Sequence, residues 1–138
     1  MTVAASTGGW QRAALVGALL ALLTAAFVAL LPEPTNGLQF LAVLLGFIAG
    51  AYLGFAVADG TTRALVVEAA GITVFVSLAA ASLWFVSPGL LAAGYVAHGI
   101  WDVAHHPRAI TTTVAGWYPP FCLVYDVLVG VFVLAWLA

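Results

Sequence analysis

Five long apolar segments, each close to the length of a membrane-spanning helix, dominate this sequence. They run over residues 11–31, 37–58, 62–86, 88–106 and 119–138. An α-helix needs about 20 predominantly apolar residues to cross the hydrocarbon core of a bilayer. Only 6% of the 138 residues are charged, whereas a soluble domain carries about 25%. We therefore expect an all-α integral membrane protein of the cell (plasma) membrane, built as a single bundle of five transmembrane helices over residues 1–138.

The arginines predict how this bundle is oriented. In a five-span chain Arg12, Arg63 and Arg108 all fall on one side of the membrane, whereas Glu33 falls on the other side. Basic residues in short loops are typical of the cytoplasmic side. We therefore expect a cytoplasmic N-terminus and a C-terminus outside. The net charge of −2 offers no basic surface, so the sequence predicts no nucleic-acid partner.

All three histidines lie within nine residues of one apolar segment. At 100° per residue, His98, Asp102, His105 and His106 fall on one face of the predicted helix. Ionisable side chains within a membrane span are costly, and they usually pair with one another or mark a functional site. This face is therefore the first candidate for function.

Two further carboxylates are expected at a similar depth in the bundle. At 1.5 Å per residue, Glu68 lies about 6–9 Å and Asp126 about 10 Å from the cytoplasmic ends of their segments. The same estimate places His98 about 10 Å and Asp102 about 5 Å from that side. The sequence thus predicts a single polar layer in the cytoplasmic half of the bundle.

Imidazole and carboxylate side chains together indicate a divalent metal, and zinc, iron and manganese all suit such ligands. A cation would also offset the charge of three buried carboxylates in a chain without lysine. Glu68 and Asp126 are in addition the candidate general bases, and Cys122, one turn before Asp126, is either a further ligand or a packing residue. The predicted metal ligands are His98, Asp102, His105, His106, Glu68 and Asp126.

Simpler interpretations of these residues stay open. His105 and His106 adjoin Pro107 and Arg108, so both histidines could lie at the membrane interface without binding a metal. The buried polar residues could also form a hydrogen-bonded network that only orders the bundle.

The pattern favours a membrane-embedded metal-dependent enzyme that acts on a lipid or isoprenoid-like substrate at the cytoplasmic leaflet. Hydrolysis ranks slightly above oxidation because it needs fewer accessory parts. The alternatives are a proton or metal-cation transporter or channel subunit, and a metal-free acid/base enzyme. Gly46, Gly50 and Gly54 form a ridge of small residues that favours close helix packing, within the bundle first and between two copies of the chain second.

Overall fold

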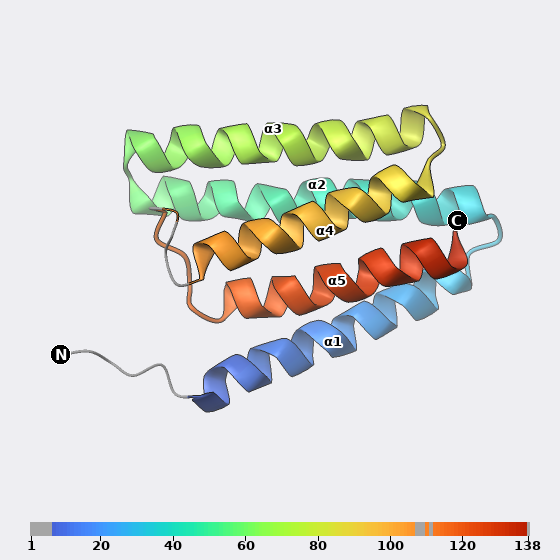
Figure 1. The fold of residues 1–138 in the computed structure, drawn as a ribbon, viewed down its shortest axis with the longest axis horizontal. Helices are drawn as coiled ribbons and strands as arrows, with labels where there is room; N and C mark the ends of the chain where they lie inside the picture. The colour runs from blue at the N-terminus through green and yellow to red at the C-terminus, as the bar shows by residue number, and fades with distance from the viewer. Residues whose placement is uncertain (1–6, 107–109, 111, 138) are drawn as a thin grey trace.

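The computed structural model is a bundle of five α-helices (Figure 1). It describes residues 7–106, 110 and 112–137. Four of the helices are long and apolar enough to cross a membrane, namely α1, α2, α3 and α5. The helices are α1 (Thr7–Ala29), α2 (Pro34–Asp59), α3 (Thr62–Trp84), α4 (Pro88–His105) and α5 (Tyr118–Trp136).

Helix α4 is the exception because it is both short and polar on one face. It has 18 residues, and three of them are His98, Asp102 and His105. All three of these side chains are buried against the other helices. Helix α4 therefore turns its polar face into the bundle, whereas Val96, Ile100 and Val103 on its other face are exposed.

Successive helices run in opposite directions, so both ends of the bundle consist of turns and helix termini (Figure 1). Helix α4 packs between α3 and α5 and also contacts α2. Helix α1 packs along α5, and α2 packs along α3. One end of the bundle carries the α2–α3 turn and the connection from α4 to α5; we call it the α2–α3 end, and the opposite end the α1–α2 end.

Short-range signals determine where the helices begin and end. Helix α2 ends at Gly60, which adopts a left-handed conformation (φ 77°) and donates its N–H to the carbonyl of Ala56. The side-chain oxygens of Thr61 and Ser87 accept backbone N–H groups and so cap α3 and α4. Helix α3 ends at Trp84 and not at Val86 as predicted, because Val86 itself adopts a positive φ of 47° and cannot continue the helix.

The buried interior divides into an apolar half and a polar half. Near the α1–α2 end the core consists of aliphatic side chains from α2, α4 and α5. Toward the α2–α3 end the buried residues include five carboxylate and imidazole side chains. The apolar half contains Leu38, Leu41, Leu45, Leu91, Val129 and Val133, and the polar half contains Glu68, His98, Asp102, His105 and Asp126.

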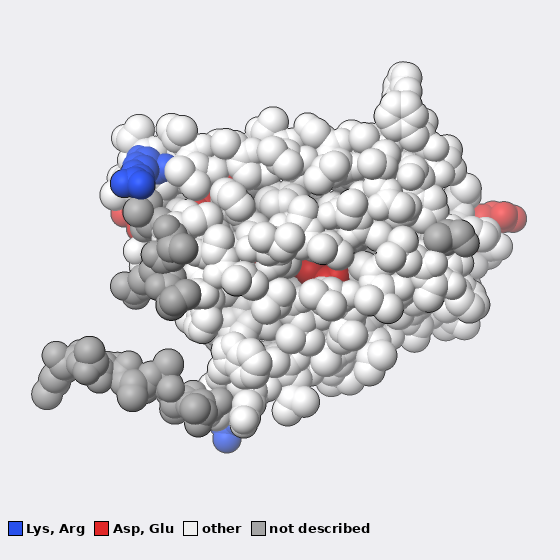
Figure 2. All heavy atoms as spheres, in the orientation of Figure 1, with Lys and Arg blue, Asp and Glu red and all other residues white. Residues whose placement is uncertain are grey.

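The outer surface is apolar along the length of the bundle. Leu15, Val43 and Phe47 are between 70% and 78% exposed, which is unusual for large apolar side chains in a soluble protein. Figure 2 shows a largely uncharged face, with basic and acidic atoms at its left end, a small acidic patch near its centre and acidic atoms at its right tip. Such a surface suits contact with lipid.

The small-residue ridge of α2 does not pack as expected. A Cβ added at Gly50 or Gly54 would meet no atom within 4 Å among the described residues, and one at Gly46 would meet only Val76 at 3.7 Å. The expectation that this ridge packs closely within the bundle therefore fails at Gly50 and Gly54.

Candidate functional site

Three fully buried ionisable groups lie together, namely His98 and Asp102 of α4 and Asp126 of α5, and we call them the His98 cluster. All three residues are fully excluded from solvent. The Nδ1 atom of His98 lies 2.6 Å from Oδ2 of Asp126 and 3.7 Å from Oδ2 of Asp102. Because His98 and Asp102 are four residues apart on one helix, they share a face, and α5 brings Asp126 against it.

Neighbouring aromatic residues hold this cluster in place. The hydroxyl of Tyr52, from α2, donates to Oδ1 of Asp102 over 2.5 Å. The ring of Phe75, from α3, meets the His98 imidazole edge to face with 4.8 Å between centroids. Four helices thus contribute to one small enclosed site.

Three polar atoms of the cluster have no hydrogen-bond partner among the residues that the structure describes. They are Nε2 of His98, Oδ2 of Asp102 and Oδ1 of Asp126. A buried polar atom left without a partner costs about 1–3 kcal/mol, and more if it is charged. One ligand atom from each residue lies within 4.8 Å of those of the other two. The three residues could therefore hold a metal ion together.

The charge of the His98 cluster also favours a bound metal ion. Two carboxylates and one imidazole carry a net charge of −1 when all three groups are ionised. Among the described residues, the ion-pair partner of both carboxylates is His98, and the described arginines, Arg12 and Arg63, are exposed. A divalent cation bound to two carboxylates and a neutral imidazole would make the cluster electrically neutral, as burial in a low dielectric requires.

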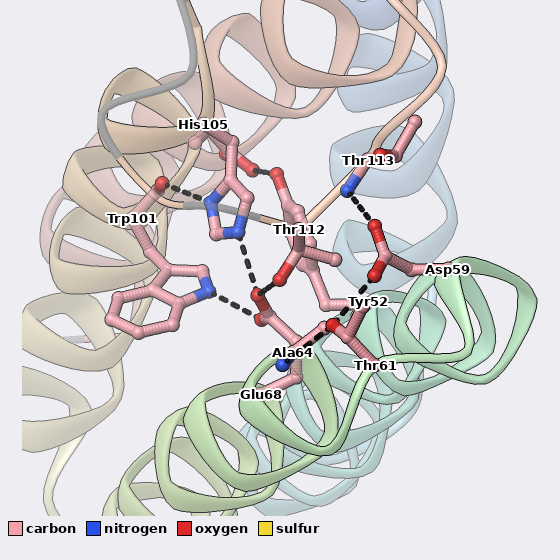
Figure 3. A network of polar contacts seen from close by, with 10 residues as sticks. Tyr52, Asp59, Thr61, Ala64, Glu68, Trp101, His105, Thr112 and Thr113 are labelled. Carbon is pink, nitrogen blue, oxygen red and sulfur yellow. Dashed lines mark hydrogen bonds and ion pairs between the residues drawn. The ribbon is translucent and has the colours of Figure 1, made fainter.

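A second polar cluster lies beside the first and consists of Glu68, Trp101, His105 and Thr112 (Figure 3). Oε1 of Glu68 lies 2.8 Å from Nε2 of His105 and accepts a hydrogen bond from the hydroxyl of Thr112 over 2.6 Å. The other oxygen, Oε2, accepts the indole N–H of Trp101 over 3.2 Å. We call this group the Glu68 cluster.

The Glu68 cluster holds one shared proton. Nδ1 of His105 lies 2.8 Å from the carbonyl oxygen of Trp101, and since a carbonyl only accepts, Nδ1 carries a proton. The bond between Nε2 and Glu68 then needs a second proton, on either the imidazole or the carboxyl group. The pair is neutral in both cases, so Glu68 is accommodated without a metal.

Helix α3 and the turn before it also hold the connection that leads from α4 to α5. Thr112 of that connection bonds to Glu68, and the N–H of Thr113 donates to Oδ2 of Asp59 over 2.9 Å (Figure 3). The same aspartate accepts the hydroxyl of Thr61 over 2.7 Å. These bonds close the α2–α3 end of the bundle over the Glu68 cluster.

Tyr52 links the two clusters. Its hydroxyl bonds to Asp102, and its ring lies against the imidazole of His105 with 4.3 Å between centroids. A displacement of the Tyr52 side chain would therefore change contacts in both clusters. Neither Tyr52 nor Thr112 was among the predicted site residues.

The six predicted metal ligands occupy three different settings. Asp126 joins His98 and Asp102 in the His98 cluster, whereas Glu68 and His105 pair with each other. His106 is exposed at the C-terminal cap of α4, and Arg108 and Pro107 lie outside the described residues. Cys122 is buried one turn before Asp126.

Comparison with known protein families places the chain in a family but assigns it no activity. A family profile matches residues 12–137, which is nearly the whole chain. The chain belongs to DUF6010, a family of unknown function. No curated protein and no solved structure matches it.

Proposed function

We propose that this protein is a membrane-embedded metal-dependent enzyme acting on a lipid or isoprenoid-like substrate at the cytoplasmic leaflet. The observation that carries the proposal is the His98 cluster: three ligand-type residues that are fully buried, close together, and each left with one unpartnered polar atom. A structural network would be expected to satisfy those atoms internally. A divalent cation, either zinc, iron or manganese, would bind one oxygen of each carboxylate and one imidazole nitrogen and would balance their charge.

The donor set favours hydrolysis over oxidation. The His98 cluster offers one imidazole and two carboxylates, whereas the facial triad of non-haem iron oxygenases uses two histidines and one carboxylate. A metal held here would activate a bound water as a nucleophile. Asp126 would bind the metal through one carboxylate oxygen, and its other oxygen is the proposed general base. The neighbouring Glu68–His105 pair, which already shares one proton, is the proposed site to which a proton passes next.

The surroundings of the cluster support a lipid-like substrate. An apolar cavity of about 290 Å³ lies between α1, α2 and α5. Its lining includes Cys122 and Tyr125, which both come shortly before Asp126 in the sequence. The Tyr125 hydroxyl is already bonded to Thr24 over 3.0 Å, so it is not free to bind a polar ligand. A cavity with such walls, in a bundle with an apolar exterior, suits a hydrocarbon chain.

We further propose that all five helices cross the plasma membrane, with the N-terminus in the cytoplasm. At 1.5 Å per residue, α4 is about 27 Å long, close to the roughly 30 Å of a hydrocarbon core. Arg12 and Arg63 both belong to the α2–α3 end and Glu33 to the α1–α2 end, which supports this orientation. A second copy of the chain would pack at the open ridge of Gly50 and Gly54.

The transporter alternative has less support because the polar residues do not continue through the bundle. Beyond the His98 cluster, toward the α1–α2 end, the buried core is largely aliphatic, and the buried hydroxyls of Tyr95 and Ser82 are bonded to backbone carbonyls. A cavity at that end is lined by Pro34, Thr35, Leu38, Val86, Pro88 and Leu137, none of which is ionisable. A proton or cation pathway would need polar groups or water in this half.

Lipid turnover tests the proposal directly. The purified protein, loaded with zinc, iron(II) or manganese, is incubated in liposomes made from a total bacterial lipid extract, and the lipids are compared by mass spectrometry. Hydrolysis would yield two fragments whose summed mass equals that of the parent lipid plus one water. Oxidation would raise the mass of the parent lipid by one oxygen. Asp102→Ala should abolish either product, and Glu33→Gln, at an exposed carboxylate, should not. No metal-dependent product from any of the three metals would contradict the proposal.

A further inference from the structure

A second cavity, smaller than the apolar one, reaches the His98 cluster from the α2–α3 end of the bundle. It has a volume of about 190 Å³ and lies between the start of α1, the end of α4 and the start of α5. Asp102 of the cluster is part of its wall. The lining consists of Trp10, Asp102, Val103, His106, Pro119, Pro120 and Leu123.

The chemistry of this lining changes along the cavity. Trp10 and Val103 are about half exposed, and His106 is exposed at the end of α4, so these three form the outer part. Asp102 is fully buried and forms the inner part, and its Oδ2 atom has no hydrogen-bond partner. Between them the walls are apolar and rigid, because two of the lining residues are the buried prolines of α5.

We infer that this cavity is the substrate site and that it takes a single-chain amphiphile, polar group first. The inner carboxylate of Asp102 accepts a hydrogen bond from a hydroxyl group of the ligand, and the apolar walls receive the first carbons of the chain. The volume lies below the roughly 300–1,000 Å³ of sites that enclose drug-sized ligands, so the rest of the chain extends past Trp10 into the bilayer. Indole side chains are typical of that interfacial level. This inference rests on the proposed function, since it supplies the substrate class and its route to the cluster.

Photolabelling with a defined amphiphile tests the inference without knowledge of the natural substrate. The probe is a long-chain alcohol with a diazirine beside its hydroxyl group, incorporated into phosphatidylcholine vesicles that contain the full-length protein. After irradiation, mass spectrometry locates the labelled residues. Label is expected on the end of α4 near Val103 and on the start of α5 near Leu123.

Two tryptophan substitutions provide the comparison. Val103→Trp fills the outer part of the cavity and should remove the label from both segments. Val131→Trp is the control, because Val131 is 59% exposed, lies in the other half of α5 and should leave the label unchanged. Both variants should keep the metal content of the wild type, which shows that the His98 cluster is intact.

The outcomes separate this inference from the proposed function. Label that persists in Val103→Trp, or that spreads evenly over the lipid-facing residues of α1, α2 and α3, would overturn the substrate site even if the protein binds metal. Label confined to the cavity and lost in Val103→Trp would support the site. That result would stand even if no metal were found, in which case the metal-dependent function would fail instead.

Discussion

Removing the hydroxyl of Tyr52 should weaken metal binding by a measurable amount. In the structure this hydroxyl donates to Oδ1 of Asp102 over 2.5 Å, and Oδ2 of the same carboxylate has no partner. Tyr52→Phe would therefore leave Asp102 without any side-chain partner at Oδ1 and free to rotate away from His98. Residues that orient a metal ligand in this way typically contribute 10–100-fold in affinity, or about 1.4–2.8 kcal/mol.

The measurement is a competition between the purified protein and a metal-chelating dye in detergent micelles at fixed pH. Tyr95→Phe is the matched control: Tyr95 is also fully buried, but its hydroxyl donates to the backbone carbonyl of Leu41 over 2.8 Å. That variant should lose about 0.5–1.5 kcal/mol of unfolding free energy and keep its metal affinity. Equal metal affinities in wild type, Tyr52→Phe and Tyr95→Phe would refute the reasoning.

Three other predictions concern the second cluster, helix packing and metal-linked stability. Glu68→Gln should reduce the unfolding free energy by about 1–3 kcal/mol, because His105 loses its charge partner, while elemental analysis finds the wild-type metal content. Loss of metal in that variant would instead make Glu68 a ligand. Gly17→Ala should destabilise the bundle by about 1–3 kcal/mol in thermal unfolding, because the new Cβ would collide with the backbone carbonyl of Phe121. Gly50→Ala, with open space at that position in the single chain, should be neutral or stabilising by up to about 1 kcal/mol for the monomer, and equal effects of the two would contradict the packing. Adding metal to about 100 times its dissociation constant should stabilise the wild type by about 2.7 kcal/mol, and a chelator should reverse this, with no response in Asp102→Ala.

The helices could be predicted from the sequence because long apolar runs and prolines leave few alternatives. All five predicted segments are helical, and their ends differ from the structure by a few residues. Helix α4 is less apolar than a typical membrane span because it contains two histidines and one aspartate. Sequence alone does not reveal which neighbouring helices cover the polar face of α4, whose other face exposes Val96, Ile100 and Val103.

The grouping of the site residues could be predicted only in part. Spacing placed His98 and Asp102 on one face, because that relation is fixed within a single helix. The partners of Glu68 and Asp126 depend on the rotation of α3 and α5 about their own axes, which apolar periodicity does not define when a helix is apolar all round. The structure therefore separates Glu68 and His105 from the other three residues.

The residues missed by the sequence reasoning are ones without a distinctive pattern. Tyr52 lies in the middle of an apolar helix, where a tyrosine is ordinarily a packing residue. Thr112 belongs to a connection whose threonines resemble those of any polar loop. The available signal was the hydrogen-bonding capacity of the buried carboxylates, since each oxygen must find a donor and few donors exist in so apolar a chain.

Elemental analysis of the purified, detergent-solubilised protein tests the central claim most directly. Wild type is compared with His98→Ala and with His106→Ala, which removes an exposed histidine from the end of the same helix. The account predicts a stoichiometric divalent transition metal in wild type and in His106→Ala, and its loss in His98→Ala. No metal in wild type after reconstitution with zinc, iron and manganese, or an undiminished metal content in His98→Ala, would contradict it.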